Sequence, residues 1–292
     1  WYTGQFYALF FLLQTLKIDA QTANLLIAGS LLLGTPFFVF FGSLSDRIGR
    51  KKIIMAGCIL AALTYFPIFH GLTQFGNPDV FAAQEKNPVT VVADPSACSF
   101  QFDPVGKAKF VSSCDMAKSL LAKRAIPYEN LKAETGALAQ VHIGDKVIAS
   151  FEGAGMPAAD FKAQSEAFTA QLAASLKEAG YPEKADPAKI NHLMMLVLLT
   201  VLVIYVTMVY GPIAAWLVEL FPTRIRYTSM SLPYHIGNGW FGGFLPTVAF
   251  AMVAATGDIY YGLWYPIVIA VMTAILGIFF LPETKDRDIN HG

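Results

Sequence analysis

The sequence predicts an all-α polytopic membrane protein with six transmembrane helices and one small α+β insert outside the cytoplasm. Of its 292 residues, 55% are hydrophobic and 14% are charged, against roughly 25% charged residues in soluble domains. More than half of the charged residues lie between Gly76 and Lys189, which hold 12 Lys or Arg and 14 Asp or Glu. The chain carries no net charge, so no basic footprint for nucleic acid is expected.

Six apolar segments account for the predicted helices, because lipid cannot satisfy open backbone groups. They are Trp1–Leu16, Thr22–Phe41, Ile53–Gln74, His192–Leu217, Ser229–Ala255 and Tyr260–Leu281. The first has 16 residues, fewer than the ~20 that cross the hydrocarbon core. We therefore expect the chain to begin inside a helix and to be a fragment. The expected division is 1–75 for three helices, 76–189 for the insert, and 190–292 for three more helices and a tail.

The basic residues predict the orientation in the membrane. Outside the insert, eight of nine basic residues fall on one side if the six segments alternate: Arg47, Arg50, Lys51, Lys52, Arg224, Arg226, Lys285 and Arg287. Only Lys17 falls on the other side. Because Lys and Arg concentrate in cytoplasmic loops, we expect both termini in the cytoplasm and the insert outside, in a bacterial inner membrane.

The polar insert reads as a small α+β domain. Val89–Ala93 and Ala139–Phe151 have strand character, and the second contains a Gly144-Asp145 turn. Asp160–Ala179 has the apolar spacing of an amphipathic helix. A long disordered loop is the alternative, because Ala and Lys are abundant and aromatic residues are few.

Two of the three cysteines, Cys98 and Cys114, lie in the insert. Outside the cytoplasm such a pair is expected to oxidise, and the disulfide would stabilise the insert by about 3 kcal/mol in the chain-entropy model. A metal site with His142 fits no standard ligand spacing, so we predict no metal and no cofactor. Cys58, within a predicted helix, is expected to be a core residue.

A charged loop between the second and third segments carries the strongest motif. Gly42, Asp46, Arg47, Gly49, Arg50 and Lys51 match the pattern G-x-x-x-D-R-x-G-R-[KR]. The loop resembles the signature that follows the second helix of each half in the major facilitator superfamily. An ordinary positive-inside loop is the alternative.

Three further segments resemble branches of that superfamily: the first and last resemble the sugar porters and the metabolite:proton symporters together, and the middle one resembles the metabolite:proton symporters specifically. They are Glu219–Arg226, Ser231–Gly243 and Pro282–Lys285. The resemblance implies the C-terminal half of a twelve-helix transporter, whose partner is an N-terminal six-helix half. It places the insert between the ninth and tenth helices, where most members have a short loop, and assigns it no role.

The resemblance also implies a cytoplasmic gate of charged residues. We expect it to comprise Asp46, Arg47, Arg50, Glu219, Arg224 and Arg226. Glu219 can pair with Arg50 or Arg226, and Asp46 can lie near a helix N-terminus or near Arg47. The alternative is that these charges only anchor helices at the interface.

A substrate site is expected near the midplane, where Gly and Pro interrupt the helices. The fifth segment is the most interrupted, with six Gly or Pro residues between Pro233 and Pro246. Polar and aromatic candidates are Tyr2, Gln5, Tyr205, Tyr210, His235, Asn238 and Trp240. No segment holds a mid-membrane Asp or Glu, so the acid that couples protons is expected in the other half.

Together these features predict a secondary transporter. The resemblance implies that it moves a small organic acid or zwitterionic metabolite together with protons. The alternative is a membrane-anchored binding or sensing protein whose insert captures the ligand. No Ser/His/Asp set, metal cluster or phosphate-binding Gly loop indicates an enzyme.

Overall fold

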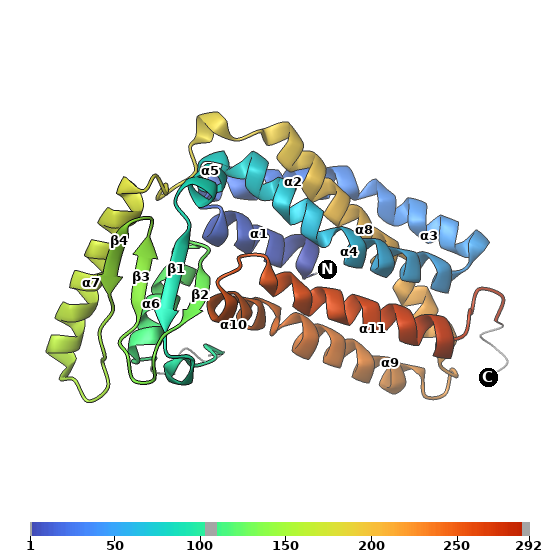
Figure 1. The fold of residues 1–292 in the computed structure, drawn as a ribbon. Coiled ribbons are helices and arrows are strands. Elements are labelled where there is room, and N and C mark those ends of the chain that lie inside the picture. The colour runs from blue at the N-terminus through green and yellow to red at the C-terminus, as the bar shows by residue number, and fades with distance from the viewer. Residues whose placement is uncertain (1, 103–109, 288–292) are drawn as a thin grey trace.

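The computed structural model describes residues 2–102 and 110–287. Long helices form a bundle, and the insert packs at one end of it (Figure 1). We call this the insert end. At the opposite end, which we call the loop end, α3 turns into α4 at Gly49, near the end of α11 (Figure 1).

The helices follow the predicted apolar segments, with different ends. The bundle consists of η1 (Thr3–Tyr7), α1 (Ala8–Phe10), η2 (Phe11–Thr15), α2 (Ala20–Gly34), α3 (Pro36–Ile48), α4 (Arg50–Gly76), α8 (His192–Leu220), α9 (Arg226–His235), η5 (Ile236–Gly242), α10 (Leu245–Thr256), η6 (Tyr261–Leu263) and α11 (Trp264–Phe280). The second predicted segment forms α2 and α3, which continue through Thr35 in the helical conformation.

Five helices of the described chain are long and apolar enough to cross a membrane. They are Ala20–Ile48, Arg50–Gly76, His192–Leu220, Arg226–Thr256 and Tyr261–Phe280. The chain is therefore a polytopic helical membrane protein. The first predicted segment is helical over Thr3–Thr15, which is shorter than a span requires. The sixth span remains a prediction.

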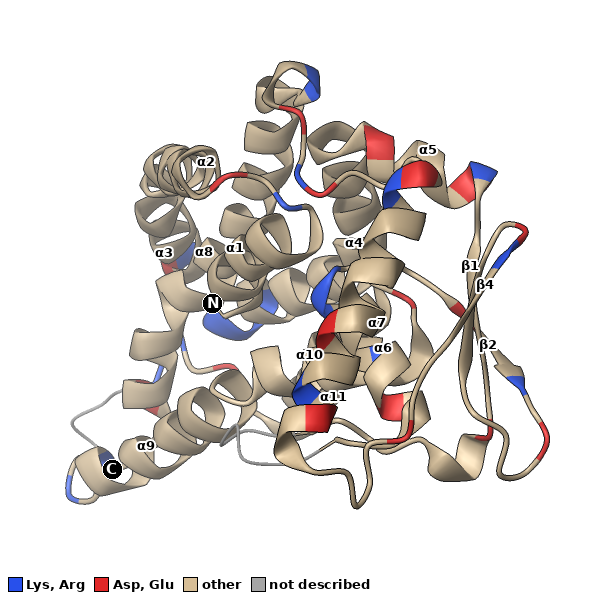
Figure 2. Cartoon of the chain, turned by 90° about the vertical axis from the view of Figure 1, so that its left-hand side faces the viewer, with Lys and Arg blue, Asp and Glu red and all other residues tan. Residues whose placement is uncertain are grey.

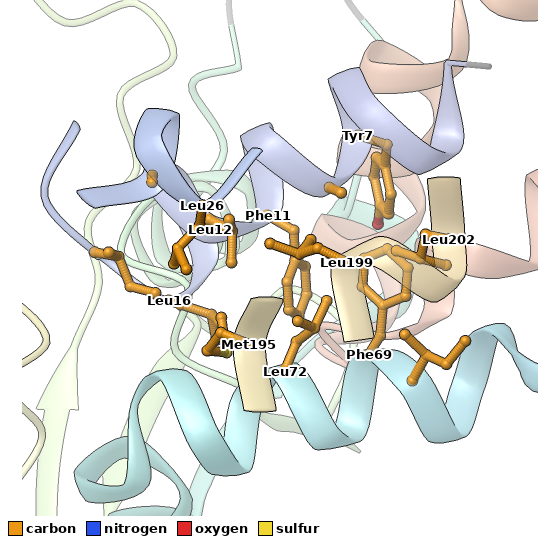
Figure 3. Packing of buried hydrophobic residues seen from close by; sticks show 14 of the residues in the cluster. Tyr7, Phe11, Leu12, Leu16, Leu26, Phe69, Leu72, Met195, Leu199 and Leu202 are labelled. Carbon is orange, nitrogen blue, oxygen red and sulfur yellow. The ribbon is translucent and has the colours of Figure 1, made fainter. Parts of the chain in front are cut away.

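Helix α8 lies at the centre of the bundle and packs against α2, α3 and α4. Glycines let the neighbouring helices approach it closely: a Cβ at Gly34 would lie 2.3 Å from Val203 Cγ1, and one at Gly57 would lie 3.0 Å from Met208 Cβ. In lipid, such close van der Waals packing holds helices together. Figure 3 shows the apolar core where Phe11, Phe69 and Leu199 meet between the first helical segment, α4 and α8.

The fifth span stays helical from Arg226 to Thr256 but changes into a π-helix in its middle, among its Gly and Pro residues. Helix α9 changes at Ile236 into the π-helix η5, and α10 begins after Gly243 and Phe244. The N–H of Gly243 lies within hydrogen-bond distance of the Asn238 and Gly239 carbonyls. Pro246 lies in the first turn of α10, where a missing N–H costs no helical hydrogen bond. Part of η5 lines an interior cavity.

The insert contains a four-stranded sheet in the order β2-β1-β3-β4. Its elements are α5 (Pro78–Lys86), β1 (Val89–Ala93), η3 (Pro95–Ala97), α6 (Ser113–Lys123), β2 (Glu129–Lys132), β3 (Gln140–Ile143), β4 (Lys146–Ala149), α7 (Ala158–Glu178) and η4 (Pro187–Lys189). Strand β2 is parallel to β1, and β3 is antiparallel to β1 and β4. The predictions of β1, of the β3–β4 hairpin and of α7 are confirmed, whereas α5, α6 and β2 were not predicted.

Helices α6 and α7 share one hydrophobic cluster with the sheet. Val89, Val91 and Ala93 point into it from β1, and Leu121 and Leu172 enter it from the two helices. The alternate burial along β1 is the pattern of a sheet with one covered face. The insert therefore has an apolar core of its own, and the disordered-loop alternative is wrong for its described residues.

The insert is joined to the bundle at the C-terminal end of α10. Four successive carbonyl oxygens there accept hydrogen bonds from it: Ala254 from the Tyr128 hydroxyl, Ala255 from Lys118 Nζ at 3.3 Å, Thr256 from Asn130 Nδ2 at 2.6 Å, and Gly257 from the Tyr128 N–H at 3.0 Å. The last carbonyls of a helix have no partner within it. The insert therefore supplies the C-terminal cap of α10, and burial in this contact raises the pKa of Tyr128 and lowers that of Lys118.

The predicted disulfide is present between Cys98, just after η3, and Cys114, in the first turn of α6. The two Cα atoms are 5.2 Å apart, within the usual range for a bridge. Cys58, on α4, is a free thiol. The bridge ties the start of α6 to the end of η3.

In membranes prepared without reductant, we expect Cys98 and Cys114 to resist alkylation and Cys58 to be the thiol that can be labelled after denaturation. Mass spectrometry after differential alkylation measures this. Reduction should make both insert cysteines reactive and lower the stability of the insert by about 3 kcal/mol. Labelling of Cys98 and Cys114 in unreduced, denatured protein would contradict the bridge.

Candidate functional site

A cavity of about 320 Å³ lies inside the bundle, between the first helical segment, α4, α8, η5 and α11. Aromatic side chains dominate its wall: Tyr2, Tyr65, Tyr205, Tyr210, Phe241 and Tyr265. The first ring packs closely on η5, where a Cβ at Gly242 would lie 2.5 Å from Tyr2 Cδ2. Gly242 therefore lets the Tyr2 ring pack directly on the backbone of η5, beside Asn238 and Phe241, which also line the cavity.

The polar groups of the cavity bind one another. The Tyr210 hydroxyl donates to Asn238 Oδ1 at 3.1 Å, and Asn238 Nδ2 donates to the Tyr234 carbonyl at 3.0 Å. Across the cavity, the Tyr265 hydroxyl donates to the Phe241 carbonyl at 3.0 Å. No Asp, Glu, Lys or Arg lines this cavity within the described ranges. The site can therefore orient a ligand by hydrogen bonds and aromatic faces, with no ionised side chain.

Four of the seven predicted substrate residues line this cavity: Tyr2, Tyr205, Tyr210 and Asn238. The other three do not. His235 is exposed and bonds to Ser231 of its own helix, and Trp240 is 70% exposed. Gln5 is buried, and its Nε2 has no hydrogen-bond partner among the described residues. Sequence reasoning missed Tyr65 and Tyr265, although aromatic residues in predicted spans were the available signal.

A second constellation lies at the loop end, around Arg50 in the first turn of α4. Arg50 Nη1 is 2.6 Å from Asp46 Oδ1, at the end of α3, and Nη2 is 3.0 Å from Glu219 Oε1, at the end of α8. The Arg50 and Glu219 side chains are only 10% and 12% exposed. The other Glu219 oxygen accepts a 2.5 Å hydrogen bond from the Thr284 hydroxyl. Arg50 therefore ties three segments together.

Glu283, which follows α11, caps the start of α4 from a distant part of the chain. Its carboxylate accepts the backbone N–H of Arg50 at 2.8 Å and that of Lys51 at 3.2 Å. Negative charge stabilises a helix N-terminus. The Glu283 carboxylate lies directly against Gly49, where a Cβ would be 2.3 Å from Oε2. Gly49 also has a φ of 117°, which residues other than glycine rarely adopt.

The cap is reciprocal, because α4 also caps α11. Lys51 Nζ donates to the Ile278 and Leu281 carbonyls, each at 2.7 Å. Positive charge stabilises a helix C-terminus. Sequence reasoning did not include Lys51, Glu283 or Thr284 in the gate, although the Pro282–Lys285 motif was a signal for two of them.

The remaining gate candidates are placed less centrally. In the described part of the chain, Asp46, near the end of α3, pairs with Arg50, the first residue of α4, across the turn at Gly49, and not with Arg47. Arg47 and Arg224 are exposed. Arg226 Nε donates to the Phe221 carbonyl at 3.1 Å. Of the two partners predicted for Glu219, Arg50 is the one with which it forms an ion pair in the described chain.

Comparisons with known proteins match both helical parts of the chain. Residues 1–82 match the family model described as Major Facilitator Superfamily, and residues 168–291 match the one described as Sugar (and other) transporter. The two matches together cover more than half of the chain. No solved structure is significantly similar to it.

Two curated proteins are similar over a short stretch. A protein of Haemophilus influenzae, named as a metabolite transport protein, is 42% identical over 81 residues, which are 27% of this chain and 17% of that protein. The glycine betaine/proline/ectoine/pipecolic acid transporter OusA of Dickeya dadantii is 34% identical over 79 residues, which are 27% of this chain and 15% of that protein. Both family models and both relatives indicate the same superfamily of transporters. The chain belongs to the major facilitator superfamily, in its sugar-porter-like branch.

Proposed function

We propose that the chain is one half of a secondary transporter that moves a small organic acid or zwitterionic metabolite together with protons by alternating access. The observation that carries the proposal is the pairing of an interior cavity with a charged latch at one end of the same helices. We use the name latch for Asp46, Arg50, Glu219 and Glu283. Helices α4 and α8 contribute to both sites. A change at the latch can therefore alter access to the cavity.

The latch acts as the cytoplasmic gate in this proposal. Its contacts cross between the ends of α3, α4, α8 and α11, so they hold only while these ends stay together. Breaking them would let the ends separate and open the cavity on that side. In this proposal the loop end faces the cytoplasm and the insert lies in the periplasm of a bacterial envelope, an orientation that the basic residues at the loop end support.

The cavity favours a zwitterion as substrate. Its wall offers aromatic faces, which attract ammonium groups, and hydroxyl and amide groups such as Tyr210 and Asn238, which can bind a carboxylate. The relative named as a transporter of glycine betaine and proline supports the same class. The cavity lining has no carboxylate within the described residues, so the second six-helix half would supply the acid that binds the proton.

We expect Asn238→Ala to raise the apparent KM for uptake about tenfold, because a half-buried hydrogen-bonding group of the cavity wall would be lost, together with its bond to Tyr210. Uptake of radiolabelled betaine or proline by the full-length transporter in proteoliposomes, with and without a proton gradient, measures this. Thr200→Val is the control, since Thr200 bonds to its own helix and does not line the cavity. An unchanged KM for Asn238→Ala would show that the substrate binds elsewhere. Uptake that does not depend on the proton gradient would contradict proton coupling.

A further inference from the structure

A second pocket, of about 270 Å³, lies at the insert end, away from the interior cavity. The turn after the first helical segment contributes Lys17, the end of α6 contributes Arg124, and the segment after α7 contributes Tyr181 and Glu183. Apolar side chains, among them Leu176 of α7, form the rest of its wall. The pocket thus places two basic side chains over an apolar floor.

The backbone at Lys17 is held in an unusual conformation. Its φ is 55°, a left-handed conformation that costs a residue with a Cβ of order 1 kcal/mol. Its carbonyl accepts the Ala185 N–H at 3.1 Å, and its Nζ donates to the Lys123 carbonyl at 2.9 Å. Both contacts reach the insert and fix the ammonium group at the pocket. Lys17 is also the one basic residue outside the insert that the alternation of spans places at this end.

Arg124 gives the pocket an uncompensated charge. Its side chain is half-buried, and its guanidinium group makes no hydrogen bond or ion pair with any described residue. Burial and the nearby Arg124 lower the pKa of Lys17, so the two cations repel each other. Glu183 lines the pocket but forms no ion pair with either cation in the described chain. A half-buried charge without a partner, such as that of Arg124, is unfavourable, and an anion between the two cations would lower this cost and their mutual repulsion.

We propose that this pocket binds a phosphate group, held between the Arg124 guanidinium and the Lys17 ammonium. A guanidinium fork matches the oxygens of phosphate, and an ammonium adds a second positive charge. The pocket lies where the first helical segment ends and α2 begins, at the ends of two apolar helical segments. The phosphate can come from an anionic lipid or from solution. The site does not depend on the transport proposed above.

The test is binding to the purified 292-residue chain in a phosphate-free maltoside detergent. One arm titrates inorganic phosphate, and the other adds phosphatidylglycerol, with a phosphate-free glycolipid as its control. The midpoint of thermal unfolding against concentration gives an apparent Kd in each arm. We expect phosphate or phosphatidylglycerol to raise the midpoint, and Arg124→Gln to weaken the Kd at least about tenfold, because a charge-assisted hydrogen bond is lost.

Two further variants make the result specific. Lys177→Gln removes an exposed charge next to Leu176 and leaves the pocket lining intact, so its Kd should stay within about twofold. Glu183→Gln removes the carboxylate from the pocket and should tighten binding about threefold. It tests the proposal even if Arg124→Gln does not fold. Stabilisation by phosphatidylglycerol alone assigns the site to lipid, and stabilisation by both assigns it to the free anion too. No stabilisation by either, or equal effects of Arg124→Gln and Lys177→Gln, overturns the proposal.

Discussion

Replacing Arg50 by Met is expected to lower the free energy of unfolding by about 3 kcal/mol. The substitution removes the cation but leaves Glu219, whose side chain is 12% exposed, with the Thr284 hydroxyl as its remaining partner among the contacts described above. Removing one member of a buried ion pair costs about 3–5 kcal/mol, because the other charge stays buried. Asp46 contributes little, since its side chain is 65% exposed and exposed pairs are weak. Denaturant unfolding in detergent, followed by tryptophan fluorescence, measures the loss.

Arg47→Met is the matched control. Arg47 belongs to the same loop, is exposed, and should change stability by less than about 0.5 kcal/mol. Adding Glu219→Gln to Arg50→Met should restore part of the stability, because it removes the unpaired charge. If Arg50→Met were as stable as Arg47→Met, the Arg50–Glu219 ion pair would not contribute to the free energy of unfolding. In the full-length transporter, a loss of uptake larger than the loss of folded protein would favour a gate over an anchor.

Replacing Gly257 by Ala should destabilise the junction between the insert and α10 by about 3 kcal/mol or more. Gly257 has a φ of 85°, and a Cβ there would lie 2.0 Å from the Tyr128 carbonyl oxygen. Backbone atoms cannot rotate away from such a clash, so Tyr128 must move and lose its hydrogen bonds to Ala254 and Gly257. The cost therefore combines backbone strain, overpacking and unpaired polar groups. Thermal unfolding in detergent and hydrogen exchange of the Tyr128 amide measure it.

Gly180→Ala separates strain from the clash. Gly180 has nearly the same φ, 87°, and an added Cβ would meet no atom within 4 Å. This variant should therefore show only the backbone cost, about 1 kcal/mol, and normal exchange at Tyr128. Equal losses in the two variants would mean that the insert and α10 are not tightly joined.

Part of the candidate site could be predicted because the signal was local. The loop motif contains both Asp46 and Arg50, so both could be named as gate residues, although their pairing across the Gly49 turn was not predicted. Glu283 acts on the same helix from 233 residues away. Its role depends on where α11 ends in space, which no local spacing encodes.

Only some of the predicted substrate residues line the cavity, and the reason lies in the form of the helix. A sequence predicts which face of a regular α-helix is apolar, but η5 is a π-helix, whose wider turn rotates every following side chain. Asn238 consequently faces the cavity, while Trp240 is 70% exposed. Strand β2 was missed because all four of its residues are exposed, so it lacks the alternation by which strands are predicted.

The cap on α10 also bears on how the chain is made. Synthesis runs from the N-terminus to the C-terminus, so Lys118, Tyr128 and Asn130 leave the ribosome before the residues of α10. The insert can therefore fold before α10 is synthesised. Its donors can then bind the four carbonyls at the C-terminal end of α10 without any rearrangement of the insert. The insert then serves as a template for completing the fifth span. A homologous domain grafted in its place would have to offer the same four donors, whatever else it binds.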